Sequence, residues 1–76
     1  NAGDYAGAIA AWDAALGFQP GDPSLSQNIL VAYSNWAVRE ANAGHFAEAR
    51  RIAQQGLARF PNDATLKDVI AFVGDR

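Results

Sequence analysis

The chain repeats itself with a period of 41 residues. When residues 1–35 are aligned with residues 42–76, ten of the 35 pairs are identical. Alanine enrichment alone would produce a few identities, but several identical pairs are Gly, Pro, Asp or Leu; examples are Gly3 with Gly44, Pro20 with Pro61, Asp22 with Asp63 and Leu25 with Leu66. Recurrence at this spacing is typical of proteins that stack one supersecondary unit on the next. We therefore expect such a unit to recur along the chain.

Composition favours helices over strands in this unit. The chain has 76 residues, half of them hydrophobic, and 17 are alanine, the strongest helix former. Its size allows one small domain and argues against most enzymes of ordinary size. Only six Lys and Arg are present and the net charge is −2, so we expect no nucleic-acid partner. The apolar runs are shorter than the ~20 residues of a membrane span.

Helix-start and helix-stop residues predict four helices. Apolar residues recur at helical spacing from Tyr5 and again from Phe46. These two helices should end before Pro20 and Pro61, whose rings cannot continue a helix. Asp22 and Asp63 then stand where a carboxylate can accept hydrogen bonds from the next helix. The remaining predicted helices run from about 23 to 42 and from about 64 to 73, where Gly74 ends the last one.

These residues resemble the tetratricopeptide repeat (TPR) family. The segment Gly3-Asp4-Tyr5-x-x-Ala8-Ile9-x-x-Trp12-x-x-Ala15-Leu16-x-x-x-Pro20 is similar to the second helix of such a repeat, and Gly44-His45-Phe46-x-x-Ala49 with Leu57 and Pro61 repeats it more loosely. Asn28-Ile29-x-x-Ala32-Tyr33 is similar to the first helix of the family. The resemblance implies an all-α fold, an α-solenoid of antiparallel helix hairpins, whose first helices line a concave groove that binds peptides or partner helices.

The period differs from the ~34 residues usual in the family. We interpret the difference as seven residues added to the 23–42 helix; two helical turns return the added part to nearly the same face. On this interpretation the chain is one TPR-like domain or fragment. Residues 1–20 form the second helix of a first repeat, 21–61 a complete extended repeat, and 62–76 the first helix of a following repeat or a capping helix.

Residues suited to catalysis or metal binding are few. His45 is the only histidine and stands where a hairpin is expected to turn, which favours a helix-start role over a general base. The chain has no cysteine, and one histidine with dispersed carboxylates cannot fill a four-ligand zinc site. We therefore predict no catalytic residue, no metal site and no cofactor. We expect the arginines to lie on solvated faces, with occasional ion pairs to Glu40 or Glu48.

The most promising candidate site is one face of the 23–42 helix. At 100° per residue, Leu25, Ile29, Leu30, Tyr33, Trp36 and Ala37 share the core side. Asn28, Asn35 and Asn42 recur every seven residues on the opposite side, beside two valines. A carboxamide both donates and accepts, so it can hold the backbone of a peptide. The predicted peptide-binding residues are Gln27, Asn28, Val31, Ser34, Asn35 and Val38. A solvated face and hydrogen bonds between helices remain alternative interpretations.

The sequence therefore predicts a protein-interaction scaffold with a protein or peptide partner. Two alternatives remain: a structural or oligomerising segment, and an appendage of a larger enzyme. The absence of Met and the start at Asn1 within a motif suggest a piece of a longer protein. We expect Tyr5, Ile9, Trp12 and Phe18 to leave an apolar patch partly uncovered, through which copies could associate. The protein should be soluble, in the cytoplasm or the periplasm.

Overall fold

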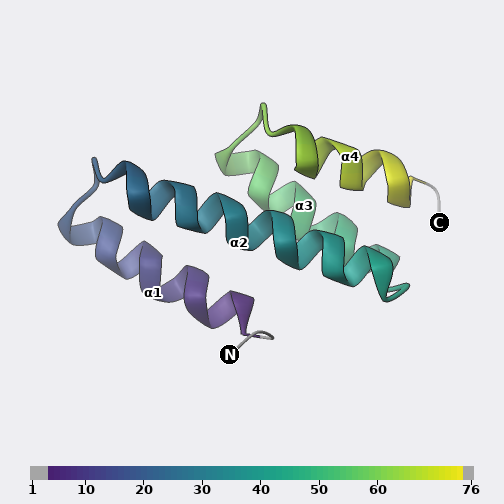
Figure 1. Cartoon of the computed structure of the whole chain (residues 1–76), viewed down its shortest axis with the longest axis horizontal. Coiled ribbons are helices and arrows are strands. Elements are labelled where there is room, and N and C mark those ends of the chain that lie inside the picture. The colour runs from purple at the N-terminus through teal and green to yellow at the C-terminus, as the bar shows by residue number, and fades with distance from the viewer. Residues whose placement is uncertain (1–3, 75–76) are drawn as a thin grey trace.

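The computed structural model describes residues 4–74, and it is all-helical in this range. The described residues form α1 (Tyr5–Phe18), α2 (Pro23–Asn42), α3 (Phe46–Arg59) and α4 (Ala64–Val73), with no strand among them (Figure 1). For residues 4–74, the prediction of an all-α fold with four helices is confirmed. Because the Cα positions extend over 39 × 27 × 14 Å, the chain forms an elongated and thin body.

Aspartates start the helices that follow the turns. An Asp22 carboxylate oxygen accepts hydrogen bonds from the backbone N–H groups of Ser24 (2.8 Å) and Leu25 (3.4 Å). Asp63 accepts one from Leu66 at 2.9 Å, and Asp4 accepts one from Gly7 at 2.9 Å. These bonds satisfy N–H groups that have no partner inside the helix. The capping roles predicted for Asp22 and Asp63 are confirmed.

The turn between α2 and α3 depends on a glycine. Gly44 has φ +86°, which glycine adopts without steric cost. Its N–H donates to the carbonyl of Ala41 at 3.1 Å, and the N–H of His45 donates to the carbonyl of Glu40 at 2.9 Å. These bonds end α2 and let α3 begin at once.

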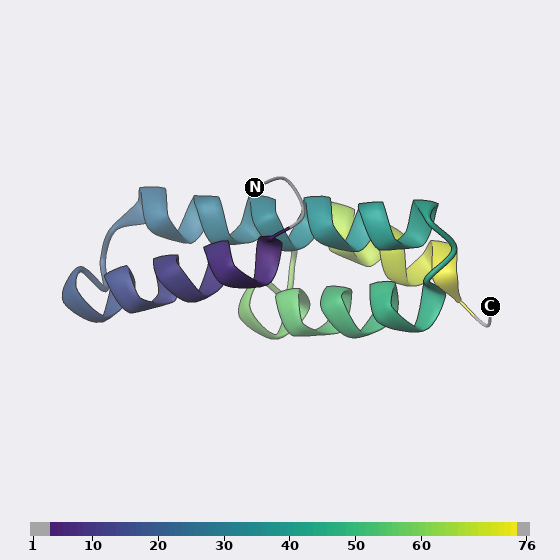
Figure 2. The same cartoon turned by 90° about the horizontal axis from the view of Figure 1, so that it is seen from below.

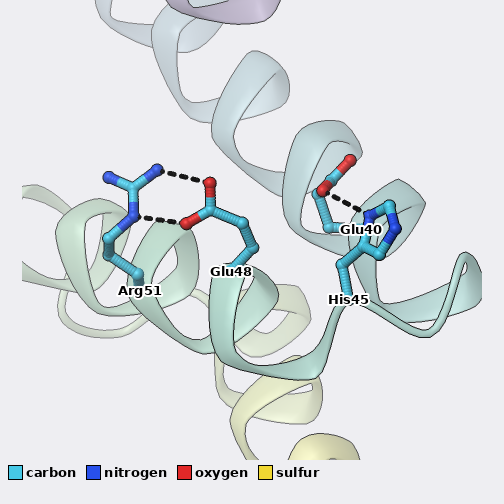
Figure 3. A network of polar contacts seen from close by, with 4 residues as sticks. All are labelled: Glu40, His45, Glu48 and Arg51. Carbon is cyan, nitrogen blue, oxygen red and sulfur yellow. Dashed lines mark hydrogen bonds and ion pairs between the residues drawn. The ribbon is translucent and has the colours of Figure 1, made fainter.

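Exposed polar contacts lie at the same turn and along the helix that follows it. In Figure 3, His45 Nδ1 lies 3.0 Å from Glu40 Oε2, and the Arg51 guanidinium donates two hydrogen bonds to Glu48. The bonds from Arg51 lower the pKa of the Glu48 carboxyl. Thus Glu48 pairs with an arginine as expected, whereas the Glu40 carboxylate contacts His45 instead. Ion pairs this exposed contribute little to stability.

Two further arginines link elements that are distant in sequence. Arg59 of α3 forms an ion pair with Asp13 of α1 at 2.7 Å, and the Asp13 carboxylate raises the pKa of the Arg59 guanidinium. Arg50 donates to the carbonyl of Gly74 at 2.6 Å. The end of α4 is thereby tied to α3, because a cation satisfies a carbonyl that has no partner in its own helix.

The long helix α2 organises the packing. Figure 2 shows α1 beside the N-terminal half of α2 and α3 beside its C-terminal half. Helix α4 packs against both α3 and α2. The backbones of α1 and α3 do not approach each other within the described residues. Consequently α2 is the element that joins α1 to the pair formed by α3 and α4.

One apolar core runs along α2. Its buried members come from all four helices; they are Ile9, Ile29, Ala32, Tyr33, Ala37, Ala41, Ala49, Ile52, Ala53, Leu66, Val69 and Val73. Ile29, Tyr33 and Ala37 confirm the predicted core side of α2, and Leu25, Leu30 and Trp36 are half-buried there. The expectation that Ile9 is uncovered is wrong. It is 6% exposed because it belongs to this core.

A glycine allows the closest approach in this core. A Cβ atom built on Gly56 of α3 would lie 2.6 Å from Leu66 Cδ1 and 3.2 Å from Tyr33 Cβ. Gly56 is buried, so these neighbours from α4 and α2 fill the space that a side chain would need. Three helices therefore meet at this residue, and they meet closely because it has no side chain.

The close approach at Gly56 predicts a difference between two glycine substitutions. Gly56→Ala should lower the free energy of unfolding by about 1–3 kcal/mol because it overpacks the core. Gly17→Ala is the matched control: Gly17 lies in α1 with open space around it, so alanine should stabilise by up to about 1 kcal/mol through helix propensity. Urea unfolding followed by circular dichroism measures both. Equal effects of the two variants would contradict the packing described at Gly56.

Candidate functional site

An open hollow of about 310 Å³ lies between α1 and the N-terminal half of α2. We call it the N-terminal hollow. Aromatic and small side chains of α1 form one wall, and amides and a valine of α2 form the other. Its lining residues are Asp4, Tyr5, Ala8, Trp12, Asn28, Val31, Ala32 and Asn35. The hollow thus combines apolar surface with a few polar groups, which is the usual make-up of a binding site.

A second open hollow, of about 290 Å³, lies between α4 and the C-terminal half of α2. We call it the C-terminal hollow. It is lined by Val38, Ala41, Asn42, Thr65, Asp68, Val69 and Phe72. Phe72 contacts Phe46 of α3 edge to face, with ring centroids 6.1 Å apart. This aromatic contact holds the α4 wall of the hollow against α3.

A third hollow, of about 450 Å³, lies between α1 and α3, and we call it the central hollow. Its residues are Ala6, Ile9, Ala10, Asp13, Tyr33, Trp36, Arg51 and Gln55. Its charged members are engaged with neighbours, since Asp13 pairs with Arg59 and Arg51 with Glu48. Each of these two charges is therefore paired with an opposite charge that does not line the hollow.

The repeat relates the N-terminal and C-terminal hollows. The α4 residues that line the C-terminal hollow correspond, 41 positions earlier, to Ser24, Gln27, Asn28 and Val31 of α2. Asn28 and Val31 line the N-terminal hollow, at the positions that Val69 and Phe72 hold in the other. The same face of the repeated helix thus borders a hollow in both copies. The two shared positions hold an asparagine and a valine in α2, and a valine and a phenylalanine in α4.

The predicted peptide-binding residues do not share one surface. Asn28, Val31 and Asn35 line the N-terminal hollow, whereas Val38 lines the C-terminal hollow. Gln27 is exposed and Ser34 half-buried, and neither lines any of these hollows. The division arises because α1 flanks one half of α2 and α4 flanks the other.

Sequence reasoning missed the wall that α1 contributes. Tyr5, Ala8 and Trp12 share one face of α1 and stand across the N-terminal hollow from the amides of α2. The sequence predicts Tyr5 and Trp12 only as members of a partly uncovered apolar patch. The repeat relation of this α1 face to Phe46, Ala49 and Ala53 is the signal that could have placed it at the site. Helix α2 covers this second set, whereas the first set lies at an open hollow.

The two amides in the N-terminal hollow are available to a ligand. Asn28 and Asn35 are both exposed. Neither side chain makes a hydrogen bond to another of the described residues. Hydrogen bonding between helices therefore does not account for them in this part of the chain. Each can donate and accept at once, and Val31 lies between them as an apolar contact.

Stacked aromatic rings form the border between the N-terminal and central hollows. Tyr5 of α1 and Trp36 of α2 lie with ring centroids 6.3 Å apart and planes inclined by 17°. Tyr5 lines the first of these hollows and Trp36 the second. The contact holds the start of α1 against the middle of α2 and so fixes the width of the N-terminal hollow.

Metal-type side-chain clusters and membrane-spanning helices are both absent from the described residues. In residues 4–74, no three His, Cys, Asp or Glu side chains gather where they could hold a metal ion. No helix in that range is both long and apolar enough to cross a bilayer. The side chain of His45 lies at the α2–α3 turn beside Glu40 and lines none of the hollows.

Comparison of the chain with models of protein families, with curated proteins and with solved structures gave no match.

The Tyr5–Trp36 contact predicts that Trp36→Ala is destabilising. Loss of the stacked ring and of its half-buried surface should lower the free energy of unfolding by about 2–3 kcal/mol. Phe18→Ala is the control, because Phe18 is 88% exposed and its loss should change stability by less than about 0.5 kcal/mol. Thermal unfolding of both variants measures the difference. A Trp36→Ala variant as stable as wild type would show that the ring does not hold α1 on α2.

Proposed function

We propose that this chain is a non-catalytic interaction module, a TPR-like α-solenoid segment that binds a polypeptide in the N-terminal hollow. The observation that carries the proposal is the repeat relation between hollows. The face of α2 that bears Asn28 and Val31 corresponds to the face of α4 that borders the C-terminal hollow. A surface repeated at the same place in each unit is what a stacked array of helices presents to a partner.

The residues of the N-terminal hollow suit a polypeptide ligand. Tyr5, Trp12 and Val31 offer apolar surface, and aromatic side chains are enriched where proteins bind one another. Asn28 and Asn35 offer donors and acceptors without charge, which match the N–H and C=O groups of a backbone. One oxygen of the Asp4 carboxylate accepts a hydrogen bond from the N–H of Gly7. The hollow is therefore suited to apolar contact fixed by amide hydrogen bonds.

The amides provide the first test of this function. Peptides of about 15 residues selected by phage display on the wild-type chain should lose affinity for Asn28→Ala and for Asn35→Ala. Each change removes one net hydrogen bond, worth about three- to tenfold in Kd. Asn62→Ala is the matched control, because Asn62 is exposed in the α3–α4 turn, and it should leave Kd unchanged. Calorimetry measures all three. Peptides that bind both hollow variants as tightly as wild type would refute the proposal.

A second candidate function, self-association, is favoured by an exposed aromatic residue. Phe18 at the end of α1 is 88% exposed, and Tyr5 and Trp12 on the same helix are only half-buried. Exposed apolar surface of this kind often marks an interface. A structural or oligomerising segment would use the exposed Phe18 to bind further copies.

Self-association predicts a mass that depends on concentration. Multi-angle light scattering of the wild-type chain, from micromolar to millimolar, should show dimers or larger species at the upper end. Phe18→Ser should shift the equilibrium toward monomer by about tenfold, because it removes apolar area from the interface. A wild-type chain that stays monomeric throughout would exclude this second candidate and leave the polypeptide-binding proposal untouched.

A further inference from the structure

The surface of the N-terminal hollow has a counterpart that the chain itself covers. Tyr5, Ala8 and Trp12 of α1 correspond by the 41-residue repeat to Phe46, Ala49 and Ala53 of α3. In α3 these alanines are 0% exposed, whereas in α1 Ala8 and Trp12 are only half-buried at an open hollow. The two copies therefore differ in what lies against them.

The C-terminal half of α2 covers the second copy. Residues 33–42 run beside α3 (Figure 2) and reach α4 at the C-terminal hollow. Their buried residues Tyr33, Ala37 and Ala41 are spaced by four and so form one stripe along the helix. The N-terminal half of α2 already packs on α1 as α4 packs on α3. Among the described residues, no helix takes on α1 and α2 the place that residues 33–42 take on α3 and α4.

We propose that the N-terminal hollow docks an amphipathic α-helix of a protein partner, oriented as residues 33–42 lie on α3 and α4. This inference rests on the proposed function and specifies the class of its ligand. The docked helix would contact α1 and the N-terminal half of α2 as residues 33–42 contact α3 and α4, which are the corresponding elements one repeat later. The partner helix carries small residues four positions apart, because Ala8 matches Ala49 and two helices approach closely only where side chains are small.

The differences between the copies specify the partner further. Gly56 leaves room for Tyr33, whose Cβ would lie 3.2 Å from a Cβ placed on that glycine. The first copy has Ala15 at the position of Gly56 and Trp12 at that of Ala53, so it leaves less room. The partner helix therefore has a smaller residue where α2 has Tyr33. Asn28 replaces Val69, and it provides a polar contact where the C-terminal hollow has an apolar one.

The chain supplies its own probe for this site. A capped synthetic peptide with the sequence of residues 30–44 and the change Tyr33→Ala reproduces the covering helix with the smaller residue. The same peptide with Arg39→Pro cannot complete a helix, because proline breaks the interior of one; Arg39 is exposed and lines none of the hollows. Fluorescence anisotropy with labelled peptides gives the affinity, and backbone NMR shifts of the full chain give the location.

The inference predicts saturable binding of the helical peptide, with shifts at Tyr5, Trp12 and Asn28. The Arg39→Pro peptide should bind at least about tenfold more weakly, as should the helical peptide to an Ala8→Gln chain, where a longer side chain blocks close approach. Ala11→Gln is the matched control, since Ala11 is exposed on the same helix and lines none of the hollows. It should bind like wild type.

Other outcomes overturn the inference and separate it from the proposed function. Equal binding of both peptides would show that the ligand is extended. The proposal of polypeptide binding would then stand, and the proposal of a docked helix would fail. Shifts confined to α3 and α4 would show that the peptide displaces α2. Self-association abolished by Ala8→Gln would show that a second copy occupies the hollow. No binding of either peptide overturns the helix, while the phage-selected peptides and the Asn28 variant still decide the proposed function.

Discussion

The packing of one uninterrupted helix, α2, holds the described part of the chain together. Its N-terminal half packs on α1 and its C-terminal half on α3 and α4, while the backbones of α1 and α3 stay apart. The ion pair between Asp13 and Arg59 also joins α1 to α3, but its partial exposure makes it a weak link. The position of α1 relative to α3 and α4 therefore depends on α2 being one continuous helix. It also depends on the apolar residues along α2, such as Ile29 and Ala37.

Small residues set how closely the neighbours of α2 can lie. Ala37, Ala41, Ala49 and Gly56 are all buried, and at Gly56 the side chains of α2 and α4 occupy the space of a missing Cβ. Close approach of backbones brings many atoms into contact without large side chains. It also fixes geometry tightly, because no flexible side chain can absorb a change in volume. The hollows lie between helices held in this way, so their shapes are determined by the same contacts.

Local signals in the sequence predict the helices well, because caps and prolines act over a few residues. Asp22 and Asp63 start α2 and α4 as expected, and Ile29, Tyr33 and Ala37 face the core. The candidate site is predicted less well. The asparagine stripe is a property of α2 alone, whereas its division between two hollows depends on which helix flanks each half. The burial of Ile9 has the same origin, since it depends on tertiary packing that α1 alone does not encode.

The two related hollows differ in chemistry at corresponding positions of the repeat. The C-terminal hollow has Val69 and Phe72, and Phe72 packs on Phe46 within the chain. Apolar surface at this place strengthens the contact between α4 and α3. The N-terminal hollow has Asn28 and Val31 at the same positions. An amide lowers the cost of exposing the surface to water and still gives a hydrogen bond when the surface is covered. At these corresponding positions of α2 and α4, only the N-terminal hollow pairs an amide with an apolar side chain.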